Sequence, residues 1–276
     1  MQMVSAAKMR KAQTAVLASR TYSSLAWELI LSLASKIHSS EPLMLTYPHA
    51  KKVGIVLLGS NRGLVGSLNS NLASKIAEIG GQGEVISEAV VFGRQAKRIA
   101  QRTGEPILAD FEKVEKTITS EDIYPLAKYI TDAYVSGEYK SIVIIYNHFV
   151  STLIQRPTIK QLLPFIPTAP SSVSDVTSND ERPDDEMEEI DLDYIFEPTP
   201  KDVLEHLVPR IVESQLYQTI LESDASEHSA RMVMMKNATE AAGDLIANLT
   251  LTYNQLRQNK ITTELAEITA GRIALE

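Results

Sequence analysis

The sequence predicts an α/β protein in which two long terminal helices form an antiparallel coiled coil next to a central α/β domain. Both ends of the chain are rich in helix-forming residues. The C-terminal end repeats apolar residues at heptad spacing. Between the ends, strands rich in Val and Ile alternate with helical stretches, which is typical of a mostly parallel sheet covered by helices.

The N-terminal helix is predicted over residues 1–40. Residues 1–38 contain neither proline nor glycine, and Pro42 follows them as a helix breaker. An apolar stripe recurs at 3-4-3 spacing on this helix, made by Trp27, Ile30, Ala34 and Ile37.

The central domain is predicted over residues 50–168. Its strands are "VGIVLL", "EAVVF", the shorter "ILADF" and "SIVIIY". Its helices are Asn69–Ile79, Arg94–Arg102 and Asp122–Val135. The stretch "VSTLIQRPTIKQLLPF" predicts two further extended pieces at one edge of the sheet, because its two prolines fit poorly in a central strand.

An acidic loop is predicted over residues 169–193. Its part from Asp175 to Asp193 holds ten acidic residues and one basic residue, and such a composition favours a solvated loop. A return strand is predicted over residues 194–200, around "DYIFEP".

The C-terminal helix is predicted over residues 201–276, with a length of roughly 110 Å at ~1.5 Å per residue. A heptad seam runs along it for more than four heptads. Residues 1–38 carry five bases and one acid, whereas residues 200–276 carry seven bases and eleven acids, so the two helices attract each other. The seam consists of Ala225, His228, Met232, Met235, Thr239, Ala242, Ile246, Leu249, Tyr253 and Leu256.

The N-terminal helix is too short to cover the C-terminal one. With Ile37 placed level with Arg210, Met1 reaches about residue 247. A bare amphipathic helix of this length does not persist well in water, so we expect another protein to enclose it. The apolar residues left without a partner in this chain are Leu249, Tyr253, Leu256, Ile261, Leu265 and Ile268.

Composition excludes several classes of protein. The chain has no cysteine, so it has no disulfide framework and no thiolate metal site. The apolar runs are too short to span a bilayer, and the N-terminus lacks a signal-peptide pattern, which predicts a soluble intracellular protein that reaches a membrane only through a partner. The formal net charge of -8 and the lack of a basic face argue against nucleic acid as a partner.

The corner "LLGSNRGLVGSLN" raises the question of a phosphate site. Gly59, Gly63 and Gly66 have G-x-x-x-G-x-x-G spacing, which matches neither the dinucleotide fingerprint nor the phosphate-binding loop. We expect these glycines to serve backbone geometry and close packing, and we expect no cofactor. A nucleotide-binding enzyme that uses the Gly59–Gly66 turn stays open as an alternative.

A catalytic or metal site is not expected. Asp224 and His228 lie one helical turn apart and could ligate a metal ion, but a third ligand is missing and His228 falls on the heptad seam. No set of nucleophile, base and orienting group can be nominated.

Several long motifs resemble the gamma subunit of F-type ATP synthases. They are "MVSAAKMRKAQ", "NRGLVGSLNSNL", "QRPTIKQLLPF", "DYIFEPTPKDVLEHLVPRIVESQLYQTILESDASEHSARMVMMKNAT" and "LTLTYNQLRQNKITTELAEITAG". The resemblance covers essentially the whole chain. It implies a Rossmann-like domain that binds no nucleotide, and terminal helices that form the central rotor shaft.

The resemblance also implies partners and a role. In that family the shaft turns inside a ring of three alpha and three beta subunits, and its foot lies near the epsilon subunit and the membrane c ring. Proton flow turns the c ring and the shaft, which drives ATP synthesis on the beta subunits and regulates ATPase activity. This chain would then be a non-catalytic subunit, peripheral on the cytoplasmic face of a bacterial cell membrane. A structural coiled-coil adaptor without effect on ATP turnover is the other alternative.

Candidate contact residues follow from the same resemblance. The family's tip contacts to beta and alpha match Arg257, Gln258, Thr262 and Glu264, and the basic band of the first helix, a beta contact, matches Lys8, Arg10 and Lys11. Tyr217 and Glu222 match the foot near epsilon and the c ring.

Two departures from the family pattern stand out. The N-terminal helix starts several turns later than in the family, which predicts either a weaker upper shaft or a true start upstream of this sequence. Arg272 stands where the family has a small residue, which predicts a looser fit of the tip.

Overall fold

The structure is a computed structural model that describes residues 2–36, 46–80, 86–113, 118–164, 197 and 199–273. Five helices and five strands are described. The helices are α1 (Gln2–Lys36), α2 (Leu68–Gly80), α3 (Arg94–Thr103), α4 (Ser120–Val135) and α5 (Pro200–Ile273). The strands are β1 (Lys52–Leu58), β2 (Ile86–Phe92), β3 (Ile107–Phe111), β4 (Tyr139–Phe149) and β5 (Gln155–Leu163).

The strands form one sheet in the order β3-β2-β1-β4-β5. The pairs β3-β2, β2-β1 and β1-β4 are parallel, and β5 is antiparallel to β4 at the edge. Six consecutive residues of β1 are buried, as expected of a central strand with both faces covered. The mostly parallel sheet is thus confirmed. The prediction of two extended edge pieces is wrong, because a single strand, β5, accommodates Pro157 at the edge and a turn precedes it.

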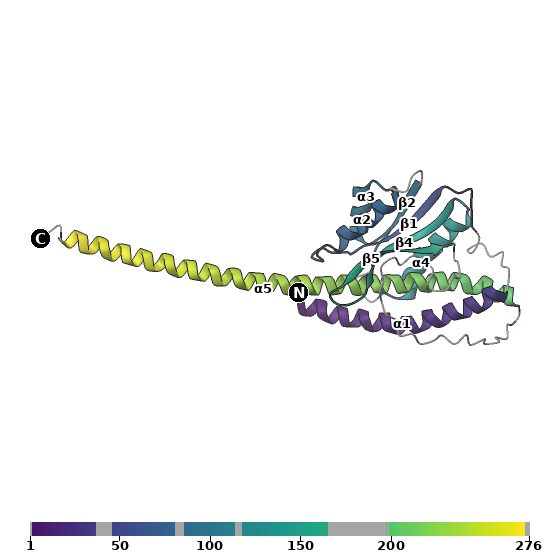
Figure 1. The fold of residues 1–276 in the computed structure, drawn as a ribbon, viewed down its shortest axis with the longest axis horizontal. Helices are drawn as coiled ribbons and strands as arrows, with labels where there is room; N and C mark the ends of the chain where they lie inside the picture. The colour runs from purple at the N-terminus through teal and green to yellow at the C-terminus, as the bar shows by residue number, and fades with distance from the viewer. Residues whose placement is uncertain are drawn as a thin grey trace.

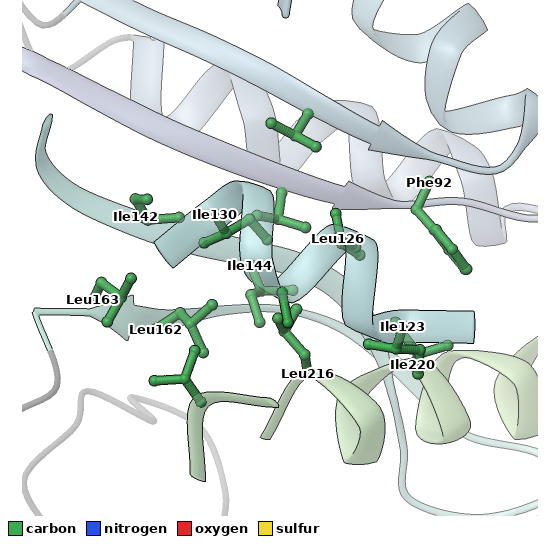
Figure 2. Packing of buried hydrophobic residues seen from close by; sticks show 14 of the residues in the cluster. Phe92, Ile123, Leu126, Ile130, Ile142, Ile144, Leu162, Leu163, Leu216 and Ile220 are labelled. Carbon is green, nitrogen blue, oxygen red and sulfur yellow. The ribbon is translucent and has the colours of Figure 1, made fainter. Parts of the chain in front are cut away.

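Helices cover the sheet on both faces (Figure 1). On one face α2 and α3 pack through Leu72, Ile76 and Ile99 onto the strands. On the other face α4 and the first half of α5 bury a larger apolar cluster, part of which Figure 2 shows around Ile144, Leu216 and Ile220. Fully burying such a side chain contributes about 1.5–3 kcal/mol, so α5 is part of the domain core and not an appendage.

The helices α1 and α5 lie antiparallel, side by side (Figure 1). Val16 of α1 packs with Leu221 and Ala225 of α5, and Ser19 hydrogen-bonds Gln218. The predicted fold class is confirmed, namely an antiparallel coil of the terminal helices plus a Rossmann-like α/β domain.

The predicted register of this coil is wrong by about three turns of helix. Gln2 lies 17 residues before Ser19, so it is level with residue 235, which lies 17 residues after Gln218. The prediction had placed Met1 near residue 247, because it set Ile37 level with Arg210. The contact between Ser19 and Gln218 sets a different alignment of the two helices.

Two predicted segments fall outside the described residues. The acidic loop over 169–193 lies wholly outside them, and so does most of the return strand over 194–200. At the end of that second range, Pro200 begins α5.

Gly59 illustrates why the corner after β1 uses glycine. A Cβ at this position would lie 2.4 Å from the backbone nitrogen of Ala96, at the start of α3. We therefore expect Gly59→Ala to lower the free energy of unfolding by about 1–3 kcal/mol, measured by urea denaturation. Gly63→Ala is the matched control, since nothing lies within 4 Å of its Cβ position. Equal stability of the two variants would contradict this assignment.

Candidate functional site

The second half of α5 stands alone. Every residue from 236 to 273 is exposed, and we call this range the projecting segment. Figure 1 shows it leaving the α/β domain near the N-terminus of the chain and running on by itself to the C-terminal end. The predicted unpartnered residues lie on it, between 50% and 69% exposed: Leu249, Tyr253, Leu256, Ile261, Leu265 and Ile268.

The predicted tip residues are all on the projecting segment and exposed. Arg257 and Gln258 are neighbours, and the hydroxyl of Thr262 donates to the carbonyl of Gln258 at 2.5 Å. Lys260 lies 3.9 Å from Glu264, a loose surface pair. The backbone thus presents one arginine, one amide and one carboxylate within two turns of helix, which suits directed hydrogen bonds to another protein.

The predicted basic band lies on α1. Lys8, Arg10 and Lys11 are exposed, whereas Met9 between them is buried. With Ser19 level with Gln218, these three cations lie level with about residues 226–229 of α5, before the projecting segment begins at residue 236.

The predicted foot residues lie inside the chain. Glu222 is 7% exposed and its carboxylate lies 2.7 Å from Nδ1 of His148 on β4. The hydroxyl of Tyr217 donates to the carbonyl of Ile118 at 3.5 Å, and its ring packs against the main core. Both residues join α5 to the α/β domain, and their contact with a further subunit stays a prediction.

A buried group of charges, which the sequence reasoning missed, holds α5 at the point where the projecting segment begins. Lys113, just after β3, forms ion pairs with Asp224 and with Glu227, the latter at 2.8 Å. Glu227 also pairs with Arg231 at 2.7 Å. We call these four residues the anchoring cluster. The signal in the sequence was present, because Asp224, Glu227 and Arg231 follow each other at helical spacing on a helix that is otherwise apolar on that face.

The charges of the anchoring cluster stabilise each other. Burial alone would lower the pKa of Lys113, but attraction to Asp224 and Glu227 outweighs burial and raises it. Burial alone would raise the pKa of Glu227, but Lys113 and Arg231 outweigh it and lower that pKa to about 2. Lys113 and Glu227 are therefore both charged at neutral pH.

This arrangement predicts a pH dependence of stability. The folded-state pKa of Glu227 lies below its ordinary value of 4.5, so its contribution is present above pH 4.5 and is lost as pH falls toward 2. Glu227→Gln lacks that contribution. We expect the variant to be less stable than the parent chain at pH 6 by on the order of 2–3 kcal/mol, and the gap to narrow between pH 4.5 and pH 2. Urea denaturation at a series of pH values measures this, and a gap that is constant with pH would contradict it.

The corner after β1 faces this chain's own helix. In a sheet of this order ligands bind at the carboxyl ends of the strands, where the strand order reverses between β1 and β4. Here the Ser226 hydroxyl of α5 donates to the carbonyl of Asn147 at the end of β4, at 2.9 Å. The Arg231 guanidinium donates to the carbonyls of Arg62 and Gly63 in the corner.

The glycines of the corner fit this packing. Gly66 has a φ of 61°, and Met234 of α5 lies 3.2 Å from where its Cβ would be. Gly59 packs closely against α3 and Gly66 against α5, so close packing explains the absence of a side chain at two of the three glycines. This confirms the interpretation of close packing and argues against the alternative of a nucleotide-binding enzyme.

Neither a metal site nor a membrane span is found in the part of the chain that the structure describes. Over these residues, no three His, Cys, Asp or Glu side chains gather closely enough to ligate an ion. None of the helices there combines the length and the apolar character that crossing a bilayer requires. Asp224, once considered with His228 as a metal ligand, is paired with Lys113.

Comparison with known proteins places the chain in a family. A family model described as ATP synthase matches residues 1–275. The ATP synthase gamma chain of Roseiflexus castenholzii is 38% identical over 280 residues, covering 100% of this chain and 91% of that relative. The ATP synthase gamma chain of Dehalococcoides mccartyi is 40% identical over 278 residues, covering 100% and 92%.

Solved structures share the fold. A chain from the central stalk and c ring of the Tetrahymena thermophila mitochondrial ATP synthase matches with a TM-score of 0.63 at 18% identity, over 87% of this chain and 97% of that one. A chain from the Euglena gracilis mitochondrial ATP synthase, in an assembly of OSCP, F1 and c ring, matches with a TM-score of 0.61 at 14% identity, over 99% and 94%.

Proposed function

The chain belongs to the ATP synthase gamma chain family, the central stalk of the F-type ATP synthase, and from this premise we propose that it is the rotating shaft that couples proton flow to ATP synthesis. Turning of a membrane c ring would turn the α/β domain, and the projecting segment would carry that rotation into the catalytic sector. In reverse, ATP hydrolysis would turn the shaft. The chain itself would perform no catalysis, and its angle would regulate ATPase activity.

The projecting segment is the observation that carries this proposal. A helix with a row of apolar side chains more than half exposed is unfavourable in water and marks a surface that another protein covers. The segment is continuous with the part of α5 that is buried in the domain core, so a push on one end is transmitted to the other. Coupling between distant sites requires such a rigid element with distinct positions.

The partners of the proposed shaft are three alpha and three beta subunits around the projecting segment, with catalysis on the beta subunits. The epsilon subunit and the c ring would bind at the foot, near Tyr217 and Glu222. The complex would lie on the cytoplasmic face of a bacterial cell membrane, and this chain would be peripheral to that membrane.

The proposed contacts divide along the shaft. Arg257, Gln258, Thr262 and Glu264 would form directed hydrogen bonds with beta and alpha near the tip. Lys8, Arg10 and Lys11 would face acidic side chains of beta, since all three cations are exposed on one stretch of α1.

Reconstitution tests this proposal. The chain is mixed with purified alpha and beta subunits, and the mass of the complex and the rate of ATP hydrolysis are followed together. We expect one copy of this chain per three alpha–beta pairs and faster hydrolysis than without it. Assembly without any change in turnover would favour the structural adaptor instead. Failure to assemble, together with ATP binding by the chain alone, would overturn the proposal.

A further inference from the structure

We propose that the anchoring cluster of Lys113, Asp224, Glu227 and Arg231 is a torsional lock that fixes the shaft to the α/β domain. The inference rests on the proposed function, because such a lock matters only in a chain that transmits torque. It adds four positioning residues that act through the shaft and not through contact with a partner.

The lock lies where torque has to pass. Arg231 is only five residues before the projecting segment begins, and Met234 of the same helix rests on Gly66 of the domain. At the same level α1 begins, so from residue 236 onward α5 continues alone. Rotation of the projecting segment relative to the α/β domain is therefore resisted first by the contact of Met234 with Gly66 and then by the residues of this cluster.

The lock holds α5 at two separate loops of the domain. Lys113 belongs to the loop after β3, and the carbonyls of Arg62 and Gly63 belong to the corner after β1. The two loops follow different strands, β1 and β3, with β2 between those strands in the sheet. A helix held at one point can turn about that point, whereas a helix held by groups from two loops resists rotation about its own axis.

The two loops are also tied to each other. The side-chain amide of Asn61 donates to the carbonyl of Lys113 at 2.7 Å, and its oxygen accepts from the backbone N–H of Arg94 at 3.4 Å. The corner after β1, the loop after β3 and the start of α3 thus form one connected seat for α5.

The bonds of the lock are directional and poorly screened. The side chains of Lys113 and Glu227 are 6% and 7% exposed, so salt and water weaken their attraction little. Apolar contacts along the rest of α5 are non-directional and tolerate small rotations, but charge-assisted hydrogen bonds of about 2.8 Å do not. The cluster therefore supplies angular stiffness that apolar packing alone does not.

The experiment measures the torsional stiffness of the shaft in the assembled synthase. The chain has no cysteine, so Gln101→Cys on the exposed face of α3 or Asn237→Cys just beyond the lock can carry a single fluorophore on this chain. With the catalytic sites held by a non-hydrolysable nucleotide, polarisation of single molecules gives the angular variance at each position.

We expect Lys113→Met to raise the angular variance at position 101 about two-fold or more, because a segment with unpaired buried charges opens locally more often. The variance at position 237 should stay unchanged, since the projecting segment is still held by its partners. ATP-driven proton pumping should fall while ATP hydrolysis continues. This loss of coupling would mean that the shaft rotates relative to the α/β domain.

Control variants separate the lock from general damage. Lys97→Met removes a similar pair, Lys97 with Asp110 at 2.8 Å, from an exposed site and should change neither variance nor pumping. Lys113→Arg keeps the positive charge, so its angular variance and its proton pumping should equal those of the parent chain. If the Lys113→Met chain does not assemble, the same measurement is made with Glu227→Gln. In that variant Lys113 keeps its ion pair with Asp224, so we expect a smaller rise in the angular variance at position 101.

If the angular variance at position 101 is the same in Lys97→Met as in Lys113→Met or Glu227→Gln, the proposal of a torsional lock is wrong. That result leaves the proposed function intact as long as ATP turns the parent shaft. If ATP does not turn the parent shaft, the proposed function itself fails, and the two failures are distinguished by the same labelled protein.

Discussion

Lys113→Met is expected to lower the free energy of unfolding of the isolated chain by about 3–5 kcal/mol. The substitution removes the ammonium group that lies between two carboxylates, and leaves Asp224 without this partner and the largely buried Glu227 with Arg231 alone. A methionine fills a similar volume, so the loss arises from unpaired charge and not from a cavity. Urea denaturation followed by circular dichroism measures the change.

The control for this prediction is Lys97→Met. Lys97 and Asp110 also form a 2.8 Å ion pair next to β3, but their side chains are 48% and 41% exposed. Exposed pairs contribute about 0–1 kcal/mol, so this variant should stay close to the parent chain. Equal losses in the two variants would mean that burial of the anchoring cluster has no energetic consequence.

Leu256→Asp is expected to have its large effect only in the complex. Leu256 is 63% exposed in this chain, so the isolated variant should unfold within about 0.5 kcal/mol of the parent. In the complex this residue would be enclosed by the alpha and beta subunits. Burying an aspartate there should weaken association by about 2–4 kcal/mol, which raises Kd roughly 30- to 1000-fold. Titration of labelled chain with alpha and beta subunits measures the affinity.

Asn254→Asp introduces the same charge on the opposite side of the helix, about 200° away at 100° per residue. Its effect on affinity should be smaller, because Leu249 and Leu256 lie on the other side of the helix at this level. If the Leu256→Asp chain binds the alpha and beta subunits as tightly as the parent chain does, these subunits do not enclose the projecting segment at this residue.

Much of the fold follows from local patterns in the sequence. The helices α3 and α4 begin and end within two residues of their predicted bounds, and β1, β2 and β4 contain the predicted Val- and Ile-rich runs. These elements are predictable because a strand buried on both faces has to be continuously apolar. The seam residue Ala225 is packed against Val16, as heptad spacing predicts.

The register of the coil could not be predicted in the same way. Heptad spacing says which face of a helix is buried, but it repeats every seven residues and so allows several alignments. Setting Ile37 level with Arg210 was one of these alignments, and the packing of Val16 against Leu221 and Ala225 selects another. Tertiary packing also keeps α5 continuous through Pro209, since Val208 and Ile211 on either side of it belong to the domain core.

The anchoring cluster was missed for a related reason. A lysine after a strand and three charges on a distant helix have no spacing in sequence that relates them, since 111 residues separate Lys113 from Asp224. Such a contact becomes visible only when the sheet order brings the loop after β3 to α5. The exposed residues of the projecting segment were predictable because amphipathic spacing continues where no second helix is available.

The most direct test of the central claim is to watch the shaft turn. A probe on Gln101→Cys is observed in single complexes of this chain with alpha and beta subunits that are fixed to a surface, while ATP is added. We expect the probe to rotate in one direction, at a rate that follows ATP hydrolysis. A probe that keeps a fixed angle while the complex hydrolyses ATP would contradict it.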